Sequence, residues 1–220
     1  MTTDQVVTEG SRLLLAKGIK ILQGNRLAPT DEEHVTRLAD YIGLNGEHNI
    51  ADLGCGFGEV SKLLSSKTKA ARFWLVNRNE FQMEHCPVGE IYRAHLEDMC
   101  ATSIPDGTMD LAMFNWSLCH VDAERALAEA RRISAPDGRL FIYDYERTGA
   151  DNRLTREYLF AHFLTDADLR ECARVTGWRE VETIHPGGDD TSFREAIGND
   201  SLYNTIVKDL RPVIWKAKRQ

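Results

Sequence analysis

Apolar residues occur along the chain in two patterns, a helical periodicity and short continuous runs, and each pattern predicts a different kind of element. In residues 11–22 and 35–42 they recur every three or four positions, which is typical of amphipathic helices. Thr30 and Glu33 supply a capping box before the second of these helices. Short apolar runs further along predict strands at residues 49–53, 72–76, 109–114, 139–145, 178–184 and 212–216.

Helical patterns alternate with these strands, at residues 60–64, 79–84, 122–133 and 165–173. Such alternation predicts right-handed βαβ units and a mainly parallel α/β sheet. Without internal repeats or linkers, we expect a single domain over residues 1–220. Its parts are N-terminal helices (1–48, a candidate lid), a core (49–185), and an irregular excursion with a terminal strand (186–220).

Composition narrows the classes of function. The formal net charge is −7, so the chain lacks the basic surface expected of a nucleic-acid-binding protein. No apolar run is long enough to span a membrane, and no basic secretory start is present. Five cysteines without CxxC spacing predict reduced thiols and a cytoplasmic location. His85 and Cys86 have no clear ligand partners, so no metal is predicted; the oligomeric state is not predicted.

The stretch from Asn49 to Glu59 carries the clearest chemical signal. An apolar run ends at Asp52 and is followed by glycines at alternate positions, namely Gly54, Gly56 and Gly58. A strand that enters a helix through such a turn lets backbone N–H groups approach a nucleotide-like ligand. A dinucleotide fingerprint needs a small residue where Glu59 stands, so a dehydrogenase is disfavoured.

With Asp52 two positions before the first glycine, this stretch resembles the first motif of class I S-adenosylmethionine-dependent methyltransferases. Further matches follow in order: Glu97-Asp98-Met99 with the run 104–110, the segment 114–122, the turn 135–138 and Gly177-Trp178. The resemblance implies a Rossmann-like class I methyltransferase fold. That fold has a seven-stranded, mainly parallel sheet with helices on both faces and an antiparallel terminal strand.

The resemblance also implies S-adenosyl-L-methionine as cofactor and a set of residues that bind it. Asp52 would neutralise the methionine ammonium, Asn77 would meet the ribose hydroxyls, and Asp98 would accept from the adenine amine. The commonest residue at position 77 is an acid, so Asn77 departs from the pattern and predicts weaker binding. The full predicted set is Asp52, Gly54, Cys55, Gly56, Gly58, Asn77, Arg78, Asp98, Met99 and Asn115.

Methyl transfer is an in-line displacement that depends mainly on alignment of the acceptor. His120 is the candidate general base, because an unperturbed imidazole titrates near neutrality. Trp116 and Tyr145 are candidate aromatic partners for the sulfonium. Asn115 is not followed by the tetrad of nucleic-acid amino-methyltransferases, so we expect a small-molecule acceptor, with a protein side chain as second choice.

Two alternatives stay open. The segment 76–82 is similar to C-methyltransferases of isoprenoid diphosphates and unsaturated lipids, although Trp116 stands where those enzymes place a glutamate. The chain could instead bind the cofactor without transferring methyl, as a sensor or partner subunit. Residues 1–22 and 186–209 are expected to cover the substrate.

Overall fold

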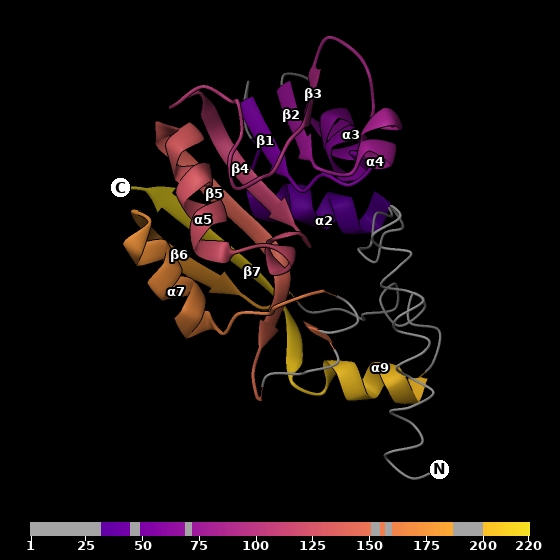
Figure 1. Cartoon of the computed structure of the whole chain (residues 1–220), viewed down its shortest axis with the longest axis vertical. Coiled ribbons are helices and arrows are strands. Elements are labelled where there is room, and N and C mark those ends of the chain that lie inside the picture. The colour runs from indigo at the N-terminus through magenta and orange to yellow at the C-terminus, as the bar shows by residue number, and fades with distance from the viewer. Residues whose placement is uncertain (1–31, 45–48, 69–71, 151–154, 157–159, 187–199) are drawn as a thin grey trace.

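The computed structural model describes residues 32–44, 49–68, 72–150, 155–156, 160–186 and 200–220 of the 220-residue chain. The predicted helix at 11–22 and the capping residue Thr30 lie outside these residues. A seven-stranded sheet of order β3-β2-β1-β4-β5-β7-β6 forms the centre of the molecule (Figure 1). The strands are β1 (Asn49–Leu53), β2 (Arg72–Asn77), β3 (Tyr92–Leu96), β4 (Met109–Asn115), β5 (Ser134–Arg147), β6 (Trp178–Ile184) and β7 (Leu210–Arg219).

All neighbouring strands pair in parallel except β7, which lies antiparallel to both β5 and β6. The order reverses between β1 and β4, the topological switch point beside which open α/β sheets bind ligands. The predicted sheet, with its antiparallel terminal strand, is confirmed.

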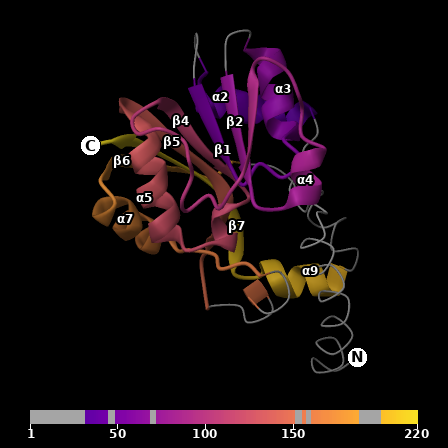
Figure 2. The same cartoon turned by 45° about the horizontal axis from the view of Figure 1, so that its top comes forward.

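Helices cover both faces of this sheet (Figures 1 and 2). The elements are α2 (Glu32–Ile42), α3 (Glu59–Lys67), α4 (Glu80–Glu84), the 3-10 turn η1 (Leu118–His120), α5 (Ala123–Ile133), α7 (Asp166–Val175) and α9 (Asp200–Val207). Asp122 caps α5 by accepting a bond from the backbone N–H of Arg125, and Thr165 with Asp168 forms a capping box on α7. Sequence positions that predict helix starts therefore act as caps.

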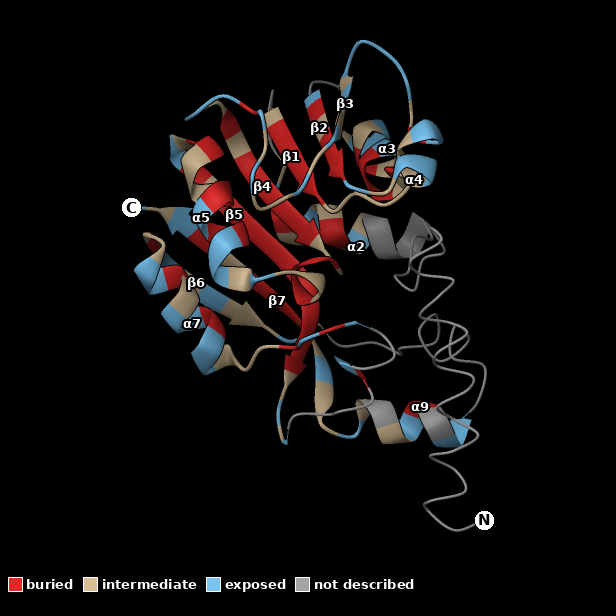
Figure 3. Ribbon diagram, in the orientation of Figure 1, coloured by how far each residue is buried: buried red, intermediate tan, exposed pale blue. Residues whose placement is uncertain are grey.

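Two apolar clusters, one on each face, hold the layers together (Figure 3). Leu38 and Ile42 of α2 and Leu64 of α3 pack on one face of the central strands. Leu127 of α5 and Leu169 of α7 pack on the other. Strands covered on both faces read as continuous apolar runs, which is why β1 and β4 stand out in the sequence.

Three parts of the fold differ from the sequence prediction. Strand β3 was not predicted, because it is an edge strand with two exposed residues in its centre, Arg93 and Ala94. The segment predicted to be irregular contains α9. Strand β5 begins at Ser134 rather than residue 139, since the Pro136-Asp137-Gly138 turn lies within it as an irregularity against β4.

Among the helices of the described residues, none has the length and apolar character needed to cross a bilayer.

Candidate functional site

The glycine turn leaves the carboxyl end of β1 and leads into α3. Gly54, Gly56 and Gly58 all adopt positive φ, at +83°, +57° and +69°. The N–H groups of Gly54 and Cys55 both donate to the carbonyl of Val76 at the end of β2, at 2.9 and 3.1 Å. The left-handed conformation explains why three glycines occur here, since a side chain is strained in it.

Space around the glycines differs in a way that points to a ligand. A Cβ on Gly54 would overlap the Cβ of Ser117 and lie 2.8 Å from Cε of Met99. A Cβ on Gly58 would lie 2.7 Å from Cδ of Pro87. A Cβ on Gly56 would meet nothing within 4 Å. The middle of the turn therefore faces open space, and its two flanks are packed.

Asp52 lies beneath this turn and is almost fully buried. Its Oδ2 accepts a bond from Oγ of Ser61 in α3, at 2.6 Å. Burial raises the pKa of the carboxyl group from 3.8 to about 6, although the Ser61 bond opposes the shift. The contact with Ser61 is thus internal, and the predicted role of Asp52 toward an ammonium group stays a prediction.

Asn77 ties the turn to the end of β2. Its Nδ2 donates to the carbonyl of Gly56 at 3.2 Å and to Oε1 of Gln82 at 2.7 Å. Its Oδ1 accepts from the N–H of Asn79 at 3.3 Å. A carboxylate has no N–H and could make only the last of these bonds. Asn77 therefore makes contacts with Gly56 and Gln82 that the commoner acid could not make. The neighbouring Arg78 is exposed.

Asp98 and Met99 lie on the loop that joins β3 to β4. Oδ1 of Asp98 accepts from the N–H of Cys100 at 2.9 Å, and the side chain of Asp98 is exposed. The contact between Met99 and Gly54 described above places this loop against the glycine turn. The two predicted binding segments therefore meet, although they are more than forty positions apart in the chain.

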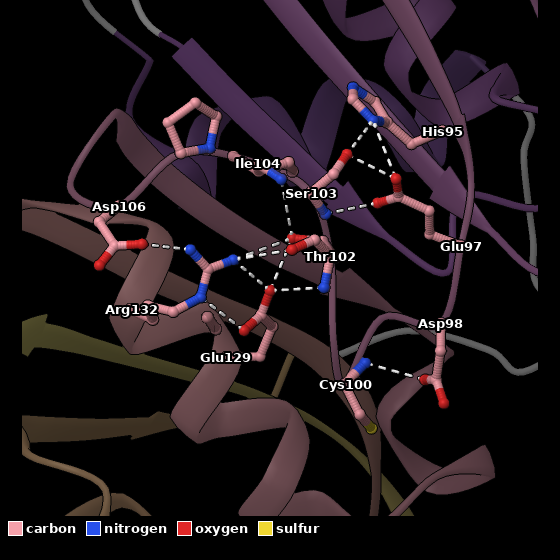
Figure 4. A network of polar contacts seen from close by, with 12 residues as sticks. His95, Glu97, Asp98, Cys100, Thr102, Ser103, Ile104, Asp106, Glu129 and Arg132 are labelled. Carbon is pink, nitrogen blue, oxygen red and sulfur yellow. Dashed lines mark hydrogen bonds and ion pairs between the residues drawn. The ribbon is translucent and has the colours of Figure 1, made fainter.

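A network of charged and hydroxyl groups attaches this loop to α5 (Figure 4). Glu129 accepts from the N–H and Oγ1 of Thr102, at 2.7 and 2.6 Å, and pairs with Arg132 at 2.6 Å. Arg132 also donates to the Thr102 carbonyl at 3.0 Å and pairs with Asp106. Desolvation opposes ionisation of Glu129, but the bonds from Arg132 and Thr102 outweigh it and lower its pKa. The loop is therefore held electrostatically.

A second carboxylate in the same loop is bonded in a similar way. Glu97 accepts from the N–H and Oγ of Ser103, at 2.8 and 2.5 Å, and lies 3.8 Å from Nδ1 of His95. Burial opposes ionisation, yet the Ser103 bonds and His95 lower the pKa of Glu97 overall.

The end of β4 meets the end of β1 at the switch point. Oγ of Ser117 donates to the Leu53 carbonyl at 2.6 Å. Oδ1 of Asn115 is buried and finds no hydrogen-bond partner within the described part of the chain. An acceptor that is left without a donor is costly, so it is suited to an N–H or ammonium group of a ligand.

Aromatic rings gather beside Asn115. The ring of Trp116 lies edge-on to those of Tyr145 and Tyr143, with centroids 4.5 and 5.8 Å apart. Phe163 lies 5.8 Å from Tyr145. Trp116 has φ +55°, a strained conformation for a residue with a side chain. Strand β4 thus ends in an aromatic cluster formed by Trp116, Tyr143, Tyr145 and Phe163.

His120 lies just beyond this cluster, at the end of η1. Its Nδ1 lies 3.0 Å from the carbonyl of Phe160, which can only accept, so Nδ1 carries the proton and Nε2 keeps a lone pair. Asp144, at the end of β5, accepts from the N–H groups of Cys119 and Tyr145 at 3.1 and 2.9 Å. Burial raises the pKa of Asp144, whereas these bonds, and the positive charge of His120 when its ring is protonated, oppose the rise.

The structure brings most predicted site residues together at the carboxyl ends of the parallel strands. Arg78 and Asp98 stand at its exposed rim, and Asp52 lies beneath it. Sequence reasoning missed the residues that hold the site together, namely Ser61, Gln82, Ser117, Glu129 and Arg132. Ser117 and Glu129 have partners 64 and 27 positions away, and the shorter separations of Ser61 and Gln82 form no recognisable motif. The helical spacing of Glu129 and Arg132 was the one available signal.

A groove lies elsewhere on the molecule, away from this site. It has a volume of about 630 Å³ and lies at the free edge of the sheet, lined by Trp74, Tyr92, Arg93, Ala94, His95, Pro105 and Thr108. None of these is a predicted site residue. Within the described residues, no three His, Cys, Asp or Glu side chains are arranged to hold a metal.

Comparison with known proteins places the fold. Residues 51–142 match the profile of a family described as a methyltransferase domain. An uncharacterized protein of a Streptomyces fradiae transposon is 30% identical over 54% of this chain and 36% of its own length. Ribosomal RNA-processing protein 8 of Arabidopsis thaliana is 32% identical over 46% of this chain and 33% of its own. The chain spans about a third of the length of these curated relatives.

Solved structures agree with the profile. Geranyl diphosphate C-methyltransferase from Streptomyces coelicolor, in complex with S-adenosyl-L-homocysteine, has a TM-score of 0.72 and 15% identity; the match covers 86% of this chain and 77% of that one. The [4+2]-cyclase SpnF has the same TM-score at 16% identity, over 86% and 80%. The chain therefore has the fold of the class I methyltransferases, and its residues 51–142 match a methyltransferase domain. Both findings confirm the resemblance that the sequence motifs indicate.

Proposed function

We propose that this protein transfers a methyl group from S-adenosylmethionine to a small-molecule acceptor by in-line displacement. The observation that carries the proposal is the pairing of an open glycine turn with an unpartnered acceptor at the switch point. Gly56 faces open space, and Oδ1 of Asn115 is buried without a donor in the described residues. The similarity to methyltransferases supports this assignment, and the cyclase SpnF shows why the fold alone does not establish it.

The residues present fit this cofactor. The turn at Gly56 admits a ligand against the backbone, and Asn115 offers an acceptor to an ammonium group. The Asp98 side chain is exposed at the rim, beside the Met99 backbone, where the family binds adenine. The sulfonium supplies an activated methyl group, and everything else depends on how the acceptor is held.

The chain's own groups then align the acceptor and remove its proton. The aromatic cluster offers ring faces that stabilise nearby positive charge. His120 accepts the proton on Nε2, because the Phe160 carbonyl fixes the Nδ1–H tautomer. The buried Asp144 carboxylate stabilises the imidazolium that results, since the two charges attract. The acceptor is small and is not a nucleic acid, as the charge of −7 predicts.

Calorimetric titration with S-adenosylmethionine and S-adenosylhomocysteine tests cofactor binding, with NADH as a control. We expect saturable binding that Gly56→Ala and Asp98→Ala each weaken at least tenfold. Gly107→Ala is the matched control for Gly56→Ala. Gly107 also has positive φ, +67°, but an added Cβ there meets ordinary contacts at 3.9 Å, far from the site. Binding of NADH alone would instead indicate a dehydrogenase, and the absence of all binding would refute the proposal.

The proton-transfer role predicts a defined kinetic effect. His120→Gln should lower kcat about 10²–10⁴-fold for an oxygen or nitrogen acceptor, the range typical of a lost general base. Its affinity for S-adenosylmethionine should remain that of the wild type. Turnover assays of an acceptor panel, followed by mass spectrometry of products, measure both quantities. An unchanged kcat would remove His120 from the mechanism.

A C-methyltransferase acting on an isoprenoid or lipid alkene is the second candidate. The aromatic cluster favours it, because a carbocation can be stabilised by the face of an aromatic ring. The glutamate that usually quenches that cation is absent, since Trp116 stands there. Geranyl diphosphate with Mg²⁺ is the diagnostic acceptor. Methylation of this alkene would favour the second candidate, and cofactor binding without turnover of any acceptor would favour a sensor or partner subunit.

The cytoplasmic location stays a prediction, resting on the use of cysteine in the sequence. The single domain over residues 1–220 and the covering roles of 1–22 and 186–209 are likewise proposals. Residues 1–31 and 187–199 lie outside the described part of the chain.

A further inference from the structure

Three sulfur atoms converge beside the glycine turn. Cys55 lies inside the turn, Met83 lies in α4, and Cys86 follows that helix. The Sγ atoms of Cys55 and Cys86 each lie 3.9 Å from Sδ of Met83. Residues that are thirty-one positions apart in the chain thus present two thiols to one another.

Both thiols share an acceptor with Asn77. Sγ of Cys55 lies 3.6 Å and Sγ of Cys86 3.5 Å from the carbonyl oxygen of Gly56, and Nδ2 of Asn77 lies 3.2 Å from it. Gly56 is the residue of the turn that faces open space. The state of the two sulfurs therefore bears directly on the position proposed for the cofactor.

The two thiols differ in reactivity. The neighbouring Cys55 thiol lowers the pKa of Cys86, whereas the Cys86 thiol and burial raise the pKa of Cys55. Burial raises the pKa of each remaining cysteine: Cys100, Cys119 and Cys172. Cys86 is thus the thiol most readily ionised, and thiolates are the nucleophilic form.

Cys86 is itself buried, but the helix that precedes it is short and exposed. Helix α4 has only five residues and buries none of them. A disulfide requires the sulfurs to approach to about 2.05 Å. The short, exposed helix can shift toward the turn, whereas the turn itself is packed on both flanks.

We propose that Cys55 and Cys86 form a reversible disulfide on exposure to a hydroperoxide, and that this bond lowers the affinity for S-adenosylmethionine. The inference deepens the proposed function, because it concerns regulation of the same site. The Cys86 thiolate attacks hydrogen peroxide, its O–O bond breaks, and hydroxide leaves to be protonated to water. The Cys55 sulfur attacks the resulting sulfenic acid, the S–O bond breaks, and a second water leaves with the Cys55 proton. Two thiols and one peroxide give one disulfide and two waters, with two electrons passing from sulfur to oxygen.

The effect on binding follows from the shared acceptor. A disulfide has no S–H, so the Gly56 carbonyl keeps only the donor from Asn77. The covalent bond also draws the segment that carries Cys86 toward the turn. Both changes alter the surroundings of the Gly56 backbone, which the cofactor must approach.

Peptide mapping detects the bond without reference to any ligand. The purified full chain is treated with hydrogen peroxide, alkylated, digested without reduction and analysed by mass spectrometry. We expect a cross-linked peptide pair containing Cys55 and Cys86, abolished by dithiothreitol and absent in Cys86→Ser. Alkylation of both thiols after peroxide treatment would overturn the proposal, whatever the protein binds.

Calorimetry then compares reduced and oxidised forms of each variant with S-adenosylmethionine. The wild type should lose at least tenfold in affinity on oxidation and regain it with dithiothreitol. Cys86→Ser keeps a donor for Gly56 but cannot cross-link, so its affinity should not respond to peroxide. Cys172→Ser, matched in chemistry but distant, should respond like the wild type; circular dichroism checks that each variant is folded. A disulfide that leaves affinity unchanged would overturn the regulatory claim, and a reduced wild type that does not bind would refute the proposed function separately from the cross-link.

Discussion

The proposed cofactor site is bounded by two segments that are held by different physical means. The turn after β1 is fixed by packing and by neutral donors: Gly54 fits against Ser117, and Asn77 donates to Gly56. The loop after β3 is fixed by ionised groups, with Glu129 bonded to Arg132 at its centre. Steric fit tolerates almost no added volume, whereas charge pairing tolerates change in shape but responds to pH.

The carboxyl groups of the two segments show this difference most directly. Burial raises the pKa of Asp52 below the turn to about 6. In the loop, hydrogen bonds lower the pKa of Glu97 and Glu129 despite partial burial. The turn is therefore more stable when its acid is protonated, and the loop when its acids are ionised. One site thus combines segments with opposite pH responses.

Gly54→Ala should cause the largest loss of stability, because it disrupts the steric fit of the turn after β1. Positive φ costs about 1–2 kcal/mol for alanine, and the overlap with Ser117 and Met99 adds about 1–3 kcal/mol. We expect a loss of about 2–5 kcal/mol in the free energy of unfolding, measured by urea denaturation. Gly56→Ala has the same backbone strain without the overlap and should lose only about 1–2 kcal/mol. Equal losses would show that packing at Gly54 does not matter.

Asp52→Asn tests the opposite pH responses. The folded chain binds the Asp52 proton more tightly than the unfolded chain, so its ionisation between about pH 4 and 6 weakens the wild type. The amide variant has no such proton to lose. The difference in unfolding free energy between variant and wild type should therefore move by about 3 kcal/mol in favour of the variant from pH 4 to pH 7, since one pKa unit is worth about 1.4 kcal/mol. Urea denaturation of both proteins across this range measures the difference. Parallel pH profiles would contradict the assignment.

Arg132→Ala removes the ion pair that holds the loop after β3 and should cause a smaller loss of stability. It leaves the Glu129 carboxylate, only 8% exposed, without its cation, and we expect a loss of about 2–3 kcal/mol at pH 7. Because the pKa of Glu129 is lowered, this stabilisation exists above its unfolded pKa of about 4.5 and disappears as the pH falls through the folded value. The loss should therefore shrink in acid, as thermal and urea denaturation can show.

Asp106→Asn is the matched control for Arg132→Ala. It removes another partner of Arg132, but the Asp106 side chain is 81% exposed. Exposed pairs contribute less than about 1 kcal/mol, so this variant should remain close to the wild type. A loss as large as that of Arg132→Ala would mean that the loop depends on its exposed end.

Much of the fold was predictable from the sequence, because buried parallel strands leave continuous apolar runs. The glycine turn, β4 and the caps of α5 and α7 are examples of such local signals. Strand β3 was not, since its exposed edge position selects no apolar pattern. Helix α9 was missed because it lies within a segment rich in glycine and acids.

The candidate site likewise has a part that the sequence predicts and a part that only the structure shows. Its backbone-determined part, the glycines, shows in the sequence because positive φ selects glycine. Its side-chain partnerships do not show, since Ser117 meets Gly54 only after β1 and β4 pair. Asn77 illustrates the limit: its departure from an acid predicts a weaker ribose contact, and only the structure reveals its bond to Gly56.

The position of β7 has a consequence for the order in which the molecule assembles. Strand β6 precedes β7 in the chain but reaches the sheet only through it, because β7 lies between β5 and β6. During synthesis, residues 178–184 must therefore wait without a strand partner until residues 210–219 emerge from the ribosome. Helix α7, which packs on α5, can hold that stretch near its final place in the meantime. Closure of the sheet is thus a late folding event that joins the two final strands in one step.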